Sequence, residues 1–202
     1  MQCLFIDIAS HSGLIACADA QSVVSSQSCD HKIRDGELLT TIQNVLTGAS
    51  WQHEDLTSLA CVIGPGGFTS LRMAVACTNV LADQLHLPSA GIHLSDLLCA
   101  RVKEEHFLWL HSTKRAELFV RGFGDYASRW PDPTHMMLGD VARNVPQGAP
   151  WVGELLPQHA DVLRECALKV LVPEDPVQVL PAFLSGISYG TNLLLPWYGR
   201  TP

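Results

Sequence analysis

The hydrophobic pattern at the start of the chain predicts three short strands. Apolar residues dominate segments 3–8 and 14–18 and recur in 22–26, and turn-forming residues occupy 11–13 and 19–21. Short apolar runs bounded by Gly, Ser and Asp are typical of strands that are joined by tight turns. We therefore expect an antiparallel meander at the N-terminal end of the chain.

The next part of the pattern predicts alternating helices and strands. A helix is expected from Asp35 to about residue 46, because five apolar residues repeat at helical spacing: Leu38, Leu39, Ile42, Val45 and Leu46. A buried strand at 59–63, a helix at 69–85, a strand at 88–92 and a helix at 94–103 follow. Residues 1–104 therefore form a first lobe with the order β-β-β-α-β-α-β-α.

The helix predicted at 69–85 is apolar around most of its circumference. Its polar positions Arg72, Asn79 and Asp83 form one narrow stripe, whereas a surface helix normally has a wider polar face. Two explanations remain open at this point. The helix is either buried between layers of its own domain or lies against a partner chain.

The pattern becomes less regular in residues 105–202, which are expected to form a second lobe. Strands are predicted at 107–110 and 117–122, and little regular structure is predicted for 124–150, which is rich in Pro, Gly, Asp and Arg. A helix at 158–167, a strand at 170–172 and a C-terminal helix at 177–186 complete this lobe.

Composition narrows the class of protein. The 202 residues are 47% apolar and 16% charged, which is typical of a compact globular protein. A formal net charge of −7 argues against a broad nucleic-acid surface, so any RNA would be held by another chain. The first residues lack the pattern of a signal peptide, and no apolar run approaches the roughly 18 residues that span a bilayer. We expect a soluble cytoplasmic protein with no membrane association.

Seven cysteines are scattered along the chain, and none are spaced as C-x-x-C. This distribution argues against a disulfide framework and against a cysteine-based zinc site. Buried structural thiols in a reducing compartment are the expected interpretation. The residues concerned are Cys3, Cys17, Cys29, Cys61, Cys77, Cys99 and Cys166.

The segment Gly64-Pro65-Gly66-Gly67 joins a predicted strand to a predicted helix. Glycines at such a junction allow a sharp turn and expose N–H groups at the positive end of a helix, where a phosphate can bind. The segment lacks the Lys-Ser/Thr pair of a Walker A loop and the spacing of G-x-G-x-x-G. The alternative is a purely structural turn in which Thr69 caps the helix.

The stretch from 64 to 72, Gly-Pro-Gly-Gly-Phe-Thr-Ser-Leu-Arg, resembles the G-P-G-S-F-T-G-L-R signature of the TsaB (YeaZ) family. Gly67 and Ser70 depart from that signature, as does Gly199 from the P-x-Y-L-R pattern that segment 196–200 resembles. Further segments resemble other family patterns: 4–10 resembles L-A-I-D-T-S/T, 38–42 resembles L-L-P-x-I, 87–95 resembles L-P-x-x-G-V-S-x-L, and 114–119 resembles R-x-G-E-V-Y.

The resemblance implies an α/β fold of the actin-like ATPase class (ASKHA, ribonuclease H-like) with two lobes, the second one shortened. It implies a heterodimer with TsaD, the catalytic paralogue that transfers threonylcarbamoyl to the adenosine beside the tRNA anticodon. The ATPase TsaE joins through this complex, and tRNA is reached indirectly through TsaD. The matching partner-binding positions lie in helices 35–46 and 69–85: Leu38, Ile42, Arg72, Ala74, Val75 and Asn79. We expect the chain alone to form a symmetric homodimer, because apolar helix faces without a partner tend to pair.

The catalytic paralogue binds a metal through H-x-x-x-H on a helix, and none of the nine histidines here has another four residues away. His106 and His111 are five apart across a predicted strand, which directs their rings to opposite faces. Relatives that hydrolyse ATP use two phosphate hairpins, and segment 111–114 lacks the D-x-G-G/T of the second. Asp7 with segment 10–13, Ser-His-Ser-Gly, is interpreted as a remnant of the first. The residues expected to form a vestigial phosphate loop are Asp7, Ser10, Gly64, Gly66 and Gly67. No catalytic residue, metal or cofactor is expected.

A non-catalytic scaffold that binds and activates TsaD is therefore the leading hypothesis. The alternative is a free-standing actin-fold ATPase or phosphotransferase that uses Asp7 and the Gly64 loop. A protease, which the older naming of the related glycoproteases suggests, is a third possibility. The absence of an H-x-x-x-H pair and of a G-x-S-x-G elbow in the sequence counts against it.

Overall fold

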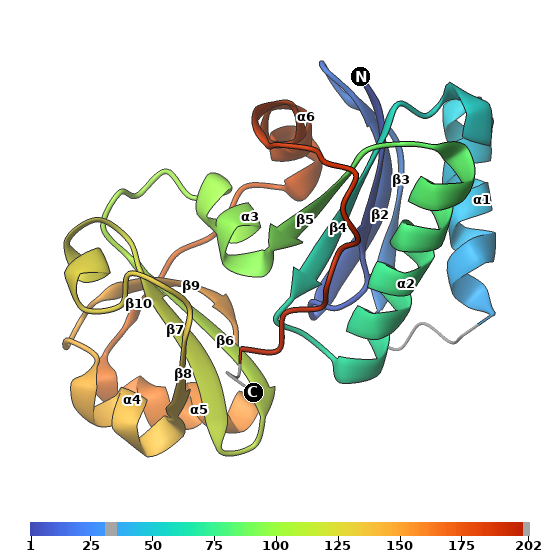
Figure 1. The fold of residues 1–202 in the computed structure, drawn as a ribbon. Coiled ribbons are helices and arrows are strands. Elements are labelled where there is room, and N and C mark those ends of the chain that lie inside the picture. Colours follow the sequence, from blue (N-terminus) through green and yellow to red (C-terminus); the bar gives the residue numbers. More distant parts are fainter. Residues whose placement is uncertain (31–35, 200–202) are drawn as a thin grey trace. The chain divides into compact units, whose positions relative to one another are not determined.

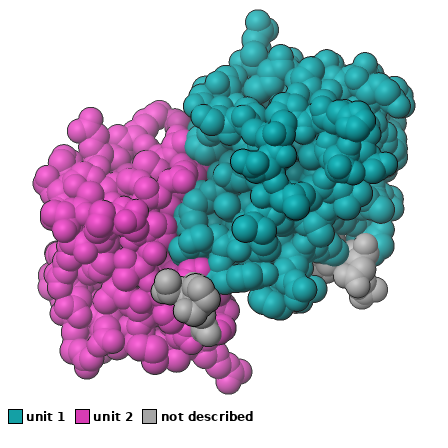
Figure 2. Space-filling view, in the orientation of Figure 1, with its two compact units in different colours: residues 1–94, 175–198 teal, residues 95–174, 199–202 magenta. Residues whose placement is uncertain are grey.

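The computed structural model describes residues 1–30 and 36–199 (Figure 1). Asp35, the predicted first residue of a helix, and Arg200 of the C-terminal motif lie outside the described residues. The chain divides into two compact units, shown in different colours in Figure 2. Unit 1 contains residues 1–94 and 175–198, and unit 2 contains residues 95–174 and 199–202.

Unit 1 is built on a five-stranded sheet of order β3-β2-β1-β4-β5. Its first three strands pair antiparallel, which confirms the predicted meander, whereas β4 and β5 run parallel to β1. The strands are β1 (Gln2–Asp7), β2 (Ser12–Asp19), β3 (Val23–Asp30), β4 (Ser58–Gly64) and β5 (Ser89–His93). Because side chains alternate between the faces of a strand, Leu4, Ile6 and Ile8 enter one core together.

Helices cover both faces of this sheet. On one face lie α1 (Glu37–Ala49) and α2 (Phe68–Leu85), which share a hydrophobic core with β1, β2 and β4 (Figure 1). A short 3-10 helix, η1 (His53–Asp55), leads from α1 into β4. The opposite face is covered by α6 (Pro176–Gly186), which packs against β2 and β3. Both helices predicted in residues 35–85 are thus confirmed.

The start of α2 differs from the prediction. The helix begins at Phe68 with Gly67 in the N-cap position, and no side chain caps it. Thr69 lies inside the first turn and is exposed, so its predicted role as helix cap is wrong. Gly67 has extended backbone dihedral angles, which glycine adopts at an N-cap with little cost.

Unit 2 repeats the strand topology of unit 1. Its sheet has the order β8-β7-β6-β9-β10, with β7 and β8 antiparallel and β9 parallel to β6. One face of the sheet forms a core with α4 and α5 that includes Leu110, Val120 and Val141. The elements are α3 (Leu94–Ala100), β6 (Leu108–Lys114), β7 (Glu117–Gly122), η2 (Gly124–Ser128), β8 (Thr134–Met137), α4 (Leu138–Asn144), β9 (Pro150–Glu154), α5 (Pro157–Leu163), η3 (Arg164–Cys166) and β10 (Lys169–Val170).

Segment 124–150 is more regular than its composition indicates. It contains η2, the edge strand β8 and the helix α4, so the expectation of little regular structure is wrong. β8 pairs with β7, and an ion pair between His135 and Glu117 joins the two strands. Val141 of α4 is buried in the core of unit 2. These tertiary contacts outweigh the weak local propensity of the segment.

The compact units differ from the predicted division at residue 104. The helix α3, after its first residue, belongs to unit 2, where Arg121 of β7 donates to Ser95 (2.7 Å) and to Asp96 (2.5 Å). The C-terminal helix α6 belongs to unit 1, because Leu180 and Leu184 are buried there. The chain thus completes unit 1 after it has formed unit 2.

Burial makes the thiols poor nucleophiles. It raises the pKa of Cys17 and of Cys61 to about 12 and that of Cys29 to about 11. At pH 8 a thiol with such a pKa is ionised in only about one molecule in 10³ to 10⁴. A disulfide reagent at pH 8 is expected to modify the half-buried Cys77 and Cys99 first and the other five slowly. All seven thiols should react at once in denaturant, and rapid labelling of Cys61 in the folded protein would contradict this prediction.

Among the helices in the described ranges, none is both long enough and apolar enough to cross a lipid bilayer.

Candidate functional site

Two loops that are distant in sequence meet in unit 1. The turn after β1 contacts the loop between β4 and α2, and the carbonyl of Ala9 accepts a hydrogen bond from the N–H of Gly67 at 3.1 Å. Gly66 has no room for a side chain, because an added Cβ would lie 2.3 Å from the same carbonyl. The residues of the predicted phosphate loop are therefore gathered at one end of the sheet.

The carboxylate of Asp7 is buried in this turn, with 3% of the residue exposed. One oxygen accepts from the backbone N–H groups of Ala9 and Ser10, both at 3.1 Å. The other accepts from the hydroxyl of Ser10 at 2.6 Å. Three N–H groups that could contact a phosphate, those of Ala9, Ser10 and Gly67, are thus already bonded within the protein.

A C-terminal strap, residues 190–198, runs past the same loop (Figure 1, red). Its Trp197 donates from its backbone N–H to the carbonyl of Ile63 at 2.7 Å. Gly64 has a φ of +142°, and an added Cβ would lie 2.2 Å from the Trp197 carbonyl. The rings of Tyr198 and Phe68 lie 5.2 Å apart, so the strap also contacts the first turn of α2. A side chain at position 64 would therefore collide with the strap, and glycine allows the two segments to lie this close together.

Four of the predicted partner-binding residues are part of the core of unit 1. Leu38 and Ile42 of α1 and Ala74 and Val75 of α2 are all buried against the sheet. Their predicted role as partner contacts is wrong, because their side chains already face β1, β2 and β4. Of the two explanations for the apolar pattern of α2, burial within its own domain accounts for this side of the helix.

The opposite side of α2 presents a second apolar surface. Four residues at intervals of four form what we call the α2 stripe: Phe68, Arg72, Ala76 and Val80. All four are exposed, Phe68 and Val80 each to 60%. The guanidinium carbon of Arg72 lies 5.2 Å from the centre of the Phe68 ring. Leu39 on α1, on the same side of the sheet, is 63% exposed.

The hydrophobic pattern did not identify Phe68, Ala76 and Val80 as surface residues. The polar stripe predicted from the sequence marks this side, since Arg72 and Asp83 are exposed. Apolar residues cover the rest of the circumference, so the pattern does not show that Phe68 and Val80 are also exposed. Phe68 belongs to the motif that resembles the TsaB signature, but it was not among the predicted partner-binding residues. Arg72, by contrast, was expected as a partner contact and is exposed.

Asn79 is held within unit 1. Its side-chain amide donates to the carbonyl of Leu194 at 3.0 Å, and its oxygen accepts from the Leu194 N–H at 2.9 Å. This two-bond contact fixes the C-terminal strap against α2. Asn79, half-buried, therefore already has a structural role in this unit.

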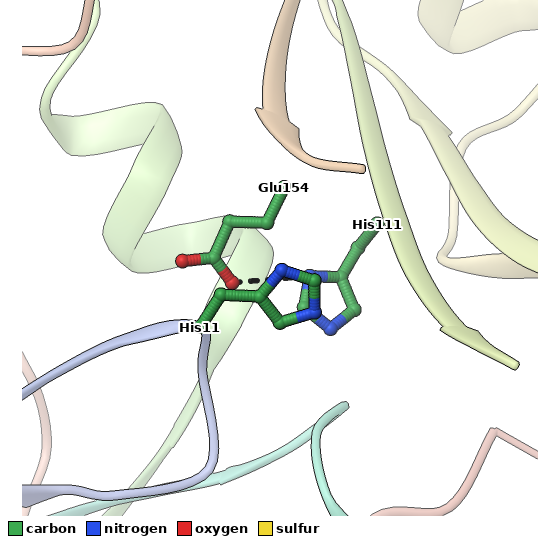
Figure 3. A group of neighbouring side chains, drawn as sticks. All are labelled: His11, His111 and Glu154. Carbon is green, nitrogen blue, oxygen red and sulfur yellow. Dashed lines mark ion pairs between the residues drawn. The ribbon is translucent and has the colours of Figure 1, made fainter. Parts of the chain in front are cut away.

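In unit 2, His111 of β6 and Glu154 of β9 lie side by side on parallel strands, with Nδ1 and Oε2 at 3.4 Å. Figure 3 shows these two side chains facing each other; His11, also drawn, belongs to unit 1. His111 and Glu154 offer fewer ligands than a zinc site uses. The expectation that no metal is bound stays a prediction. His106 lies before β6 begins, so the argument that a strand separates its ring from that of His111 does not apply.

A second polar contact in unit 2 lies under α5. The hydroxyl of Ser112 is 2.7 Å from Nδ1 of His159, and Nε2 of His159 is 2.9 Å from the carbonyl of Arg115. Because that carbonyl can only accept, Nε2 carries the hydrogen and Ser112 donates to Nδ1. The pair has the geometry of a serine with a general base, but both residues are fully buried. The two hydrogen bonds of His159 hold α5 against the end of β6 and the β6–β7 turn.

The repeated topology defines the class of the protein. Each unit has three antiparallel strands followed by two parallel ones in the order 3-2-1-4-5, which is the arrangement of the actin-like (ASKHA, ribonuclease H-like) fold. One solved structure of this kind, an "Activator of the 2-Hydroxyisocaproyl-CoA Dehydratase from Clostridium difficile with bound ADPNP", is 11% identical with a TM-score of 0.51, and the match covers 92% of this chain and 94% of that chain. The predicted fold class is confirmed.

Two solved structures from Pseudomonas aeruginosa are more similar. They are "YeaZ" and an "uncharacterized protein with similarity to peptidase YEAZ", each 16% identical with a TM-score of 0.71 over 98% of this chain and 99% of that chain. No curated protein sequence matches the chain. The family model "TsaD: tRNA N6-adenosine threonylcarbamoyltransferase" matches residues 34–143. The chain therefore belongs to this tRNA-modification family, and the resemblance to its TsaB (YeaZ) members is confirmed.

Proposed function

We propose that this protein is a non-catalytic subunit that binds TsaD and supports threonylcarbamoylation of tRNA. The observation that carries the proposal is the α2 stripe, an exposed row in which three of the four residues are apolar, on a helix whose other side is already buried. Phe68 and Val80 remain 60% exposed although both are large and apolar. Exposed apolar surface of this kind is typical of a protein–protein interface.

The absence of catalysis is part of the proposal and rests on the loops of unit 1. The carboxylate of Asp7 is engaged by the turn that it stabilises, so it has little capacity to bind a metal–nucleotide complex. The sequence contains no H-x-x-x-H pair to hold a catalytic metal. Binding of tRNA then falls to TsaD, as the net charge of −7 also favours. TsaE would join through the same complex.

The test is co-expression with the TsaD of the same host, followed by size-exclusion chromatography with mass detection. The wild-type chain is expected to form a stable heterodimer. Val80→Arg should weaken this complex roughly 30-fold, because a charge replaces an apolar contact worth about 2 kcal/mol. Gln158→Arg adds the same charge to an exposed position in unit 2 and should leave the affinity unchanged.

Without TsaD, the chain is expected to pair with a second copy through the same stripe, as a symmetric dimer. Val80→Arg should then give a monomer, and Gln158→Arg should remain dimeric. A wild-type chain that forms no complex with TsaD at micromolar concentration would contradict the proposed function.

A further inference from the structure

A pocket opens at the C-terminal end of α2. Its walls are the last turns of α2, the start of β5 and the first part of the C-terminal strap. The strap is fixed there by a pair of backbone hydrogen bonds between Ser89 and Gly190, at 2.8 and 3.0 Å. Most of the lining is polar: Asn79, Asp83, His86, Ser89, Thr191 and Asn192.

Ser89 supplies a hydroxyl to this pocket. The residue is 5% exposed, and its register opposite Leu59 directs its side chain to the face of the sheet that α2 covers. Its hydroxyl lines the pocket and can both donate and accept a hydrogen bond, so it is available to a polar ligand there.

The negative charge of the pocket favours a ligand that is positively charged. Asp83 contributes a carboxylate, and the final carbonyls of α2 carry the negative end of the helix dipole. Among the residues that the structure describes, no lysine or arginine lines the pocket, and His86 is the one lining residue able to carry a positive charge. A hard metal ion usually requires several carboxylates, and the lining offers one. An ammonium or guanidinium group fits better, because it donates several hydrogen bonds and carries positive charge.

The position of the pocket connects it to the α2 stripe. Asp83 is exposed and lies three residues beyond Val80, so a chain that packs along the stripe passes the mouth of the pocket. We propose that the pocket receives an arginine or lysine side chain of the partner that binds the α2 stripe. This inference rests on the proposed function and specifies the chemistry of one contact in that interface.

The test is isothermal titration of purified TsaD into the intact chain at several salt concentrations. Asp83→Asn is expected to weaken binding about tenfold at low salt and to flatten the dependence of affinity on salt. Ser89→Ala should weaken binding about threefold. Glu54→Gln removes the same charge from another exposed position of unit 1 and should change neither quantity.

The outcomes separate the two proposals. If TsaD binds and Val80→Arg weakens binding, but Asp83→Asn behaves as Glu54→Gln does, the pocket proposal alone is overturned. If wild type does not bind TsaD, the proposed function is overturned together with this inference. If EDTA removes the effect of Asp83→Asn, the occupant is a metal ion and the assignment of a basic side chain is wrong. Because Asp83 is exposed, thermal unfolding of Asp83→Asn should match that of wild type.

Discussion

Ala74→Arg is expected to prevent unit 1 from folding. Ala74 is fully buried between α2 and the sheet, within a core that includes Leu4, Leu59 and Val75. An arginine there requires the core to accommodate a much larger side chain and to bury an unpaired charge. Each effect costs several kcal/mol, while a domain of this size is stable by only about 5 to 15 kcal/mol. We expect insoluble protein or a chain without a cooperative unfolding transition.

Ala76→Arg is the matched control. It lies two residues further along the same helix but on the exposed α2 stripe. Its free energy of unfolding in urea should remain within about 0.5 kcal/mol of wild type. Circular dichroism and urea titration distinguish the two variants. If Ala74→Arg folds with wild-type stability, the buried side of α2 is assigned incorrectly and this residue becomes a candidate partner contact again.

Asp7→Ala is expected to lower the free energy of unfolding by about 3 kcal/mol. The buried carboxylate accepts three hydrogen bonds, from two backbone N–H groups and from the hydroxyl of Ser10. Its removal leaves these donors without their partner in a region with little access to water, and each such loss costs roughly 1 to 3 kcal/mol. Part of this cost is recovered when water enters the turn. Urea titration of the purified variant measures the change.

Asp19 provides a control with the same local geometry at the surface. Its carboxylate accepts from the N–H groups of Gln21 and Ser22, both at 2.7 Å, in the turn after β2. These bonds hold the pKa of Asp19 below its usual value. Because water can replace the carboxylate there, Asp19→Ala should cost less than about 1 kcal/mol. The stabilising effect of the Asp19 carboxylate is present above its unfolded pKa and is lost as pH falls through its lowered folded pKa.

The same Asp7 variant tests the alternative of a free-standing ATPase. An enzyme of that kind would show saturable binding of ATP with magnesium in calorimetry, and Asp7→Ala would remove this binding without a large loss of stability. The proposed scaffold predicts the reverse pattern, in which stability falls and no nucleotide binding exists to be lost. The two readouts therefore separate a structural carboxylate from a catalytic one.

The strands and helices of unit 1 were largely predictable, because each depends on the spacing of neighbouring residues along the chain. The meander of β1–β3 and the helices α1 and α2 follow directly from apolar periodicity. The elements β8 and α4 were not predictable, since β8 is a short edge strand that depends on its pairing with β7. Its segment contains turn-forming residues whose local preferences indicate irregular structure.

The candidate site was predictable only in part. The motif from 64 to 72 indicated the family, and in the structure the turn after Asp7 contacts the loop that begins at Gly64. The partner-binding residues were chosen from helices whose apolar residues surround the axis, and four of the six are buried in the core. Leu38 and Leu39 illustrate the difficulty, because they are chemically identical neighbours and only one of them faces the sheet.

The sequence by itself determined the order of the elements of the first lobe, which follows from local periodicity. The resemblance of a continuous motif indicated the family and, through it, the actin-like class. Tertiary structure alone decided that Phe68 and Val80 of α2 are exposed, where the C-terminal helix packs and what holds the carboxylate of Asp7. These features depend on contacts between distant residues, such as Asn79 and Leu194, which are 115 positions apart. Such contacts form when apolar surfaces are buried together, and the pattern along one segment does not specify the segment that will cover it.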